Sequence, residues 1–164
     1  MEVIRAPENR ISQSYIRVQR ITGALWFTGE ILVLAIIYIL SEKFDWYGWI
    51  DWIIYGLVGV AILYAVWSIG IAPMLMQRYW RYDVGEEFVQ LQHGRLIRSD
   101  QLIPLTKVQY VELGQGPLLR SQGLYRIEIG TMGSQHAIPG LLEQEAYRVR
   151  ERIAELARIK EVEE

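Results

Sequence analysis

Cysteine is absent from this 164-residue chain, and only two histidines occur, His93 and His136. Without cysteine the chain has no disulfide bonds, thiolate catalysis or cysteine-ligated metals. Neither histidine has a carboxylate beside it at metal-ligand spacing, so the sequence predicts no metal site. Nucleophile-elbow, Walker and complete dinucleotide-binding motifs are missing as well, and we therefore expect no enzymatic activity and no cofactor.

A strong excess of one charge is also lacking, because the formal net charge is −2. Nucleic-acid binding needs a basic surface that this balance does not supply, so no nucleic-acid partner is expected.

Charge is scarcest in two long apolar segments. Residues 21–40 carry a single charge, Glu30, and residues 52–76 carry none. With a rise of about 1.5 Å per residue, each segment can cross a hydrocarbon core of about 30 Å. We predict a transmembrane hairpin over residues 21–76, with a loop at 41–51. A cleaved signal peptide is the alternative for the first segment, but no small-x-small cleavage site follows it at residues 41–43.

The basic residues near these segments predict the orientation. The cytoplasmic flanks of membrane helices are enriched in arginine and lysine. Lys43 is the only base in the connecting loop, which also holds three acids. We therefore expect a plasma-membrane protein with an external loop and both termini cytoplasmic. The arginines that flank the spans are Arg5, Arg10, Arg17, Arg20, Arg78 and Arg81.

The remaining residues are expected to form one small domain. Residues 1–20 have helical spacing after a possible cap at Asn9, and residues 78–140 alternate with the period of short strands. A two-residue turn at His93-Gly94 would place Leu91 opposite Leu96, and a slipped alternation predicts a bulge near Tyr110. The helical period returns over 141–159, before an acidic tail at 160–164.

These patterns together predict an α+β membrane protein. A two-helix transmembrane hairpin should precede an antiparallel β-sandwich or barrel over residues 78–159, capped by a C-terminal helix. Residues 117–122 should form a loop or a single helical turn, because glycines at 114, 116 and 123 take the chain out of the sheet and back.

Three blocks of sequence carry a resemblance to a known family: Ile103–Gln109, Gln115–Arg120 with Gly123-Leu124, and Ile138–Leu141. They resemble the bacterial pleckstrin-homology-like (PH-like) domain of the YdbS-like membrane proteins. The resemblance covers roughly residues 20–156 and implies a PH-like fold after a two-helix hairpin, without implying catalytic residues. It suggests headgroup binding by analogy, but the turn at residues 83–87 has three acids and no base, which would repel phosphate.

Glu30 is a candidate interaction residue because a charged carboxylate near mid-membrane costs about 2.5 kcal/mol or more. Neither apolar segment holds a base, so we expect Glu30 to bond Tyr55, Tyr64 or Ser68, or another subunit. The other candidates are Arg95, Arg98 and Lys107, as a basic patch, and Gln115 and Arg120, in the 114–123 loop.

The sequence favours a non-enzymatic interaction or scaffold module held at the cytoplasmic face of the plasma membrane. Its partners would be membrane lipids and a protein, which includes a second copy of the chain; edge strands and the 114–123 loop are the expected contacts. Two alternatives are a binder of lipids or amphiphiles at the membrane surface and an accessory subunit of an export or efflux assembly.

Overall fold

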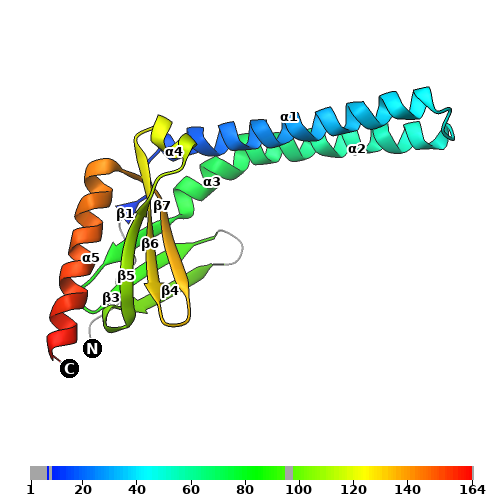
Figure 1. The fold of residues 1–164 in the computed structure, drawn as a ribbon. Coiled ribbons are helices and arrows are strands. Elements are labelled where there is room, and N and C mark those ends of the chain that lie inside the picture. The colour runs from blue at the N-terminus through cyan, green and yellow to red at the C-terminus, as the bar shows by residue number, and fades with distance from the viewer. Residues whose placement is uncertain (1–6, 8, 95–97, 164) are drawn as a thin grey trace. The chain divides into compact units, whose positions relative to one another are not determined.

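The computed structural model describes residues 7, 9–94 and 98–163, with side chains as far as Arg158. It divides into two compact units (Figure 1). One unit is the helical hairpin, residues 19–74. The other is a folded domain built from two separate stretches of chain, the N-terminal residues up to Val18 and everything from Leu75 onward. The hairpin is therefore inserted into the sequence of the domain.

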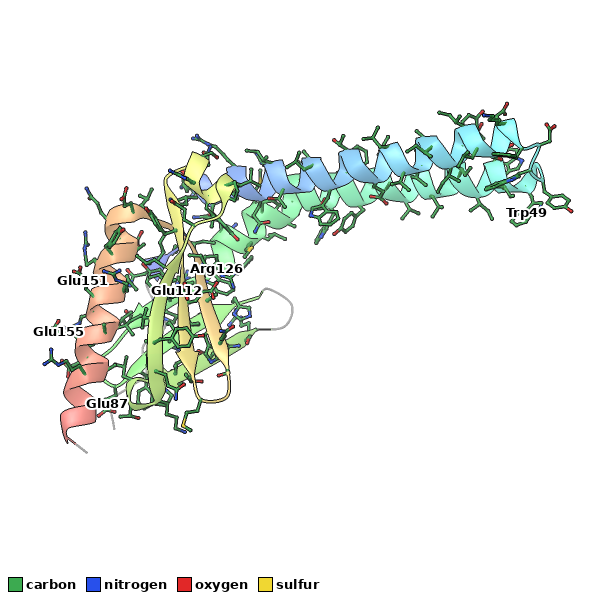
Figure 2. The ribbon with its side chains drawn as sticks, in the orientation of Figure 1. Trp49, Glu87, Glu112, Arg126, Glu151 and Glu155 are labelled. Carbon is green, nitrogen blue, oxygen red and sulfur yellow. The ribbon has the colours of Figure 1, made fainter. Side chains whose placement is uncertain are left out.

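The hairpin consists of two long apolar helices lying side by side (Figure 1). Helix α1 spans Ser14–Lys43, and a continuous helical segment spans Trp49–Tyr79. With 30 and 31 residues and a mean hydropathy of 2.0, both can cross a membrane by length and composition. Trp49 lies at the turn between them (Figure 2). Both helices extend beyond the apolar segments 21–40 and 52–76.

The second span changes its helical geometry before a proline. It comprises α2 (Trp49–Ala65), a π-helical stretch η1 (Val66–Ile71) and α3 (Ala72–Tyr79). Pro73 has no N–H to donate to the preceding turn, and such a residue disrupts the regular helical bonding. The Ala72 amide bonds the Trp67 carbonyl, five residues back, so the chain stays helical across the proline.

Small side chains allow the two helices to approach closely. Ala61 and Ala65 are 2% and 8% exposed, whereas no heavy atom lies within 4 Å of the Cβ position at Gly56 or Gly59. A Cβ at Gly23 would lie 3.0 Å from Ile69 Cγ1. The alanine face of α2 therefore packs inside the hairpin, as small residues do in membrane helix pairs.

The domain has two antiparallel sheets and a C-terminal helix (Figure 1). The first sheet has the order β1-β2-β3-β4, with strands Asn9–Arg10, Arg81–Val84, Phe88–His93 and Ser99–Pro104. The second has the order β5-β6-β7, with strands Val108–Gly114, Leu124–Thr131 and Gln135–Leu142. Between them lie η2 (Leu105–Lys107) and α4 (Pro117–Ser121), and α5 spans Glu143–Glu163.

One hydrophobic core joins both sheets to α5. Ala146 and Ile153 are fully buried on the helix, whereas Glu151 and Glu155 point away from the sheets (Figure 2). Burying such side chains stabilises the domain by roughly 25 cal/mol per Å² of apolar surface. The strand residues of the core are Tyr82, Val89, Leu91, Ile103, Ile127, Ile129, Ile138 and Leu141.

Strand predictions were partly confirmed. The register shifts between Val108 and Tyr110, which is the expected bulge, and Pro104 ends β4 at the edge of its sheet. The two-residue turn at His93-Gly94 is wrong, because Leu91 pairs with Gln101 and His93 with Ser99. Five residues, 94–98, connect these strands; three of them, Arg95, Leu96 and Ile97, lie outside the described residues.

Both termini of the domain differ from the expected helices. Asn9 and Arg10 do not begin a helix but pair with Tyr82 and Arg81 in a sheet, and helix α1 begins at Ser14. At the other end, β7 continues through Leu142, and α5 begins at Glu143 instead of residue 141. In each case the residues have helical periodicity, but their backbone N–H and C=O groups form hydrogen bonds with a strand from elsewhere in the chain.

The N-terminal segment docks on β7 at Gly140. The Ser12 amide donates to the Gly140 carbonyl over 2.9 Å, and Gly140 has a φ of +67°. A Cβ there would lie 2.5 Å from Tyr15 Cγ. Only glycine combines this backbone conformation with so close an approach.

Gly140→Ala should therefore destabilise the domain by about 2 kcal/mol or more, from left-handed strain plus the clash with Tyr15. Thermal unfolding of the full chain in detergent measures it. Gly133→Ala is the matched control, because nothing lies within 4 Å of its Cβ position, and it should change stability by less than about 0.5 kcal/mol. Equal melting temperatures for the two variants would contradict the assigned contact.

A buried tyrosine joins β2 to α5. The Tyr82 hydroxyl donates to Glu145 Oε1 over 2.6 Å, and Tyr82 is 2% exposed. Burial, followed by this bond and the charge of Glu145, raises the pKa of Tyr82 above its ordinary value of 10.0. A raised folded-state pKa contributes stability that is fully present below the unfolded pKa and is lost as pH rises beyond it.

Tyr82→Phe should lower the free energy of unfolding by about 1–3 kcal/mol at pH 8, since a hydrogen bond to a charged group is lost. Above about pH 10, wild-type stability should fall more steeply than that of the variant, because unfolding then releases the Tyr82 proton. Melting curves from pH 8 to 11 test this, with the exposed Tyr47→Phe as control. Parallel pH profiles for wild type and Tyr82→Phe would refute the linkage.

Candidate functional site

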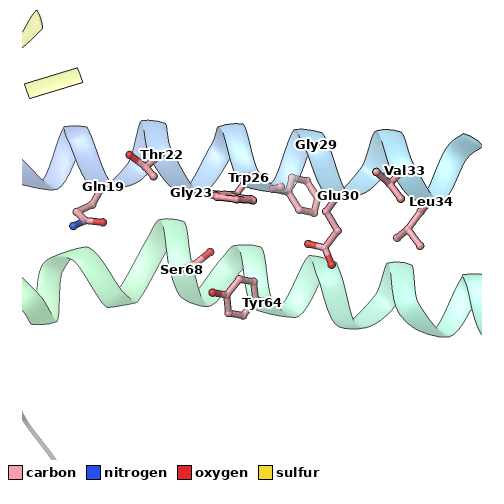
Figure 3. Close-up of a pocket in the computed structure, with 11 residues that line it drawn as sticks. Gln19, Thr22, Gly23, Trp26, Gly29, Glu30, Val33, Leu34, Tyr64 and Ser68 are labelled. Atoms are coloured by element: carbon pink, nitrogen blue, oxygen red, sulfur yellow. The ribbon is translucent and has the colours of Figure 1, made fainter. Parts of the chain in front are cut away.

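An open groove of about 820 Å³ runs along the hairpin (Figure 3). Its walls come from one face of α1 and from the second span. On α1 the lining positions recur at intervals of three or four residues, which places them on one side of a helix. We call this the hairpin groove; its residues are Gln19, Thr22, Gly23, Trp26, Phe27, Gly29, Glu30, Val33, Leu34, Tyr64 and Ser68.

Glu30 is the one charged residue of the hairpin groove. Its carboxylate points from α1 toward the second span, where Tyr64 and Ser68 line the opposite wall (Figure 3). The structure therefore brings Glu30 to the same groove as two of its three expected partners, whereas Tyr55 lies outside it. Glu30 is exposed and forms no hydrogen bond or ion pair with any residue that the structure describes.

A second cavity, of about 450 Å³, lies in the folded domain. Among the residues that the structure describes, four arginines line it, from the β1, α3, β2 and β4 regions, and no carboxylate does. Ring stacking of Trp80 on His93, with centroids 4.5 Å apart, holds the start of β2 beside the end of β3 at this place. We call this cavity the arginine pocket; its residues are Arg10, Arg78, Tyr79, Arg81, Gln92, Gly94 and Arg98.

Of the expected basic patch, only Arg98 lies in the arginine pocket. Lys107 lies in η2, beyond the other end of β4, and lines a different cavity against α5. The six residues of β4 lie between Arg98 and Lys107, and at about 3.3 Å per residue this strand is about 20 Å long. Arg95 lies outside the described residues.

The loop between β5 and β6 is a single helical turn, α4, as expected. Gln115 is half-buried, and its Nε2 donates to the Leu124 carbonyl over 3.1 Å, so this side chain fastens the loop to β6. Arg120 is exposed on α4.

Sequence reasoning did not connect Arg10, Arg78 and Arg81 with Arg98. The first three were interpreted as charges that orient the hairpin, and nothing local in the sequence marks them as neighbours of Arg98. Pairing of Arg10 with Arg81 joins segments about 70 residues apart. The one sequence signal that could have located the arginine pocket is the cluster Arg78-Tyr79-Trp80-Arg81.

Comparison with known proteins agrees with this architecture. The family model for the bacterial PH domain matches residues 29–157. The chain belongs to the bacterial PH domain family. It is 32% identical over 159 residues to the UPF0699 transmembrane protein YdbS of Bacillus subtilis (strain 168), which covers 93% of this chain and 94% of the relative. No solved structure matches the chain.

The family and the fold together establish a bacterial PH domain in a transmembrane protein. The turn between β2 and β3 is acidic and exposed at Glu86 and Glu87. The arginine pocket lies at the opposite end of the same two strands, beside Arg81 and Gln92. Within the described ranges, no three histidine, aspartate or glutamate side chains gather where they could hold a metal ion.

Proposed function

We propose that this chain is a non-enzymatic, membrane-anchored interaction module. The hairpin anchors the PH domain at the cytoplasmic face of the plasma membrane, and the hairpin groove receives a transmembrane helix of a partner protein. The observation that carries the proposal is Glu30, an exposed carboxylate in an open groove of an apolar hairpin.

The position of Glu30 calls for a hydrogen-bond donor from outside the chain. It stands at the tenth of the 20 residues 21–40, where a charged group costs about 2.5 kcal/mol or more in lipid. Neither apolar segment contains a lysine, arginine or histidine to offset that cost. A partner helix with a polar or basic side chain would supply the missing donor and cover the groove.

Small residues in the groove suit such a partner. Gly29 has no heavy atom within 4 Å of its Cβ position, so a helix backbone can approach α1 there. Close approach over small residues, together with hydrogen bonds between helices, is how membrane helices associate.

The cytoplasmic orientation is supported by charge and by connectivity. Because β1 pairs with β2, the chain enters and leaves the hairpin from one folded domain, as an even number of crossings requires. Arginines flank both of these ends, and the connecting loop has a single base.

Substitution of Glu30 tests the partner helix. Glu30→Gln keeps a hydrogen-bonding group and should retain the partner. Glu30→Leu should reduce its recovery about threefold, which corresponds to loss of about 0.6 kcal/mol, a typical value for a hydrogen bond between membrane helices. The measurement is quantitative mass spectrometry after extraction in mild detergent. Thr28→Leu is the control, since this exposed polar residue does not line the groove.

A photo-crosslinker locates the contact independently. At Val33, which lines the groove, it should capture the protein that Glu30→Leu loses; at Leu32, equally exposed but outside the groove, it should not. Equal recovery with all three variants, or equal capture from both positions, would exclude the groove as the partner site.

Cysteine labelling tests the orientation without background, because the chain has no native cysteine. In intact cells a membrane-impermeant maleimide should label Tyr47→Cys in the connecting loop. It should reach Gly133→Cys, an exposed position of the β6–β7 turn, only after permeabilisation. The reverse labelling pattern would place the domain outside.

A further inference from the structure

We propose that the arginine pocket binds a phosphate group, carried either by an anionic lipid headgroup or by a soluble phosphate. The site is separate from the hairpin groove, and the proposal does not depend on the partner helix.

The first support is an uncompensated concentration of positive charge. Four guanidinium groups line one cavity, and none of the other lining residues that the structure describes is a carboxylate. In the described part of the chain, the ion pairs are Arg126–Glu128 and Arg150–Glu151, and neither involves the pocket. Three of the four arginines are exposed, and Arg81 is half-buried, so their charges remain available to a ligand.

The strand register makes this concentration unfavourable without an anion. Arg10 lies directly opposite Arg81 in the β1–β2 pair, and like charges in such positions destabilise a sheet. Relief from nearby acids is limited. Register places Asp83 and Asp100 on the same face of the sheet, where both keep their charge, but neither carboxylate lines the pocket or forms an ion pair with one of its arginines.

The lining chemistry favours phosphate over a carboxylate. A guanidinium donates two parallel hydrogen bonds to a phosphate, and several guanidiniums can share its three or more oxygens and its higher charge. Tyr79 and Gln92 add neutral donors, and Gly94, with a φ of +96°, presents backbone without a side chain. The volume of about 450 Å³ is within the range of small-molecule sites.

The sequence position of the pocket suits a lipid source. Only three residues, 75–77, separate Arg78 from the last residue of the hairpin unit. Tyr79 and Trp80 follow, and such amphipathic rings favour the headgroup layer. A soluble phosphate would meet the same donors, so the experiment must separate the two sources.

Thermal-shift titration of the full chain in neutral detergent and phosphate-free buffer tests the proposal. The probes are dioctanoyl phosphatidic acid, dioctanoyl phosphatidylcholine, inorganic phosphate and pyrophosphate. A ligand that binds only the folded state raises the melting temperature with concentration, which yields a dissociation constant. Phosphatidic acid should stabilise the wild-type protein, and phosphatidylcholine should not.

Two pocket variants and one matched control assign the effect to the pocket. Arg81→Gln with Arg98→Gln, and separately Arg10→Gln with Arg78→Gln, should each weaken phosphatidic acid binding at least tenfold. Arg126→Gln with Arg152→Gln removes the same charge outside the pocket and should change binding less than twofold. Should one pocket pair fail to fold, the other pair decides.

The probes then identify the source. Stabilisation by phosphatidic acid alone supports a headgroup site, and equal stabilisation by inorganic phosphate or pyrophosphate, with the same dependence on the variants, supports a soluble phosphate. The proposal is overturned if no phosphate probe binds, if phosphatidylcholine binds equally, or if the control pair loses as much affinity as the pocket pairs.

Ligand-free stability provides an independent readout. Arg10→Gln removes one member of the like-charge pair and should raise the melting temperature in phosphate-free buffer, while reducing the further rise that phosphatidic acid produces. A fall in the ligand-free melting temperature, with the phosphatidic acid response intact, would show that the arginines serve the fold alone.

Discussion

The pairing of β1 with β2 is the constraint on which the rest of this structure depends. It joins residues that precede the first transmembrane helix to residues that follow the second. The Ser12 amide bonds Gly140, and Gln77 Nε2 donates to the Ile11 carbonyl over 3.4 Å, so contacts from both sides of the hairpin reinforce the pairing. A domain closed in this way holds both ends of its membrane anchor within one fold.

The same pairing determines where charge accumulates. Arginines flank the hairpin ends, where they orient a membrane protein during insertion. Because β1 lies against β2, these arginines are also neighbours in space, and the β4 region adds Arg98. Glu30 is the converse case, because its carboxylate lies in a groove whose lining residues include no base. Among the lining residues that the structure describes, each site carries one sign of charge, and this is the basis of the two proposals.

Local patterns predicted much of the fold. The two apolar segments lie in the two long helices, and the alternating residues 124–129 lie in β6. The slipped alternation corresponds to the bulge at Val108–Tyr110. Prediction failed where a distant strand competed with a local preference. Asn9–Arg10 joined a sheet because β2 offered backbone partners, and residues 141–142 extended β7 because β6 pairs with them. The His93-Gly94 turn failed because the register follows burial of Leu91 and Ile103, which turn composition does not encode.

The sequence alone determined that this protein is held in a membrane by a hairpin and carries a small PH-like domain. Hydrophobic length and short-range periodicity are properties of consecutive residues, so they can be read without coordinates. Only the tertiary structure decided which polar residues meet. Gln115 proved to fasten a loop, Lys107 and Arg98 lie at opposite ends of β4, and Arg10 lies opposite Arg81. These neighbourhoods depend on pairing between segments far apart in the chain, which no local pattern specifies.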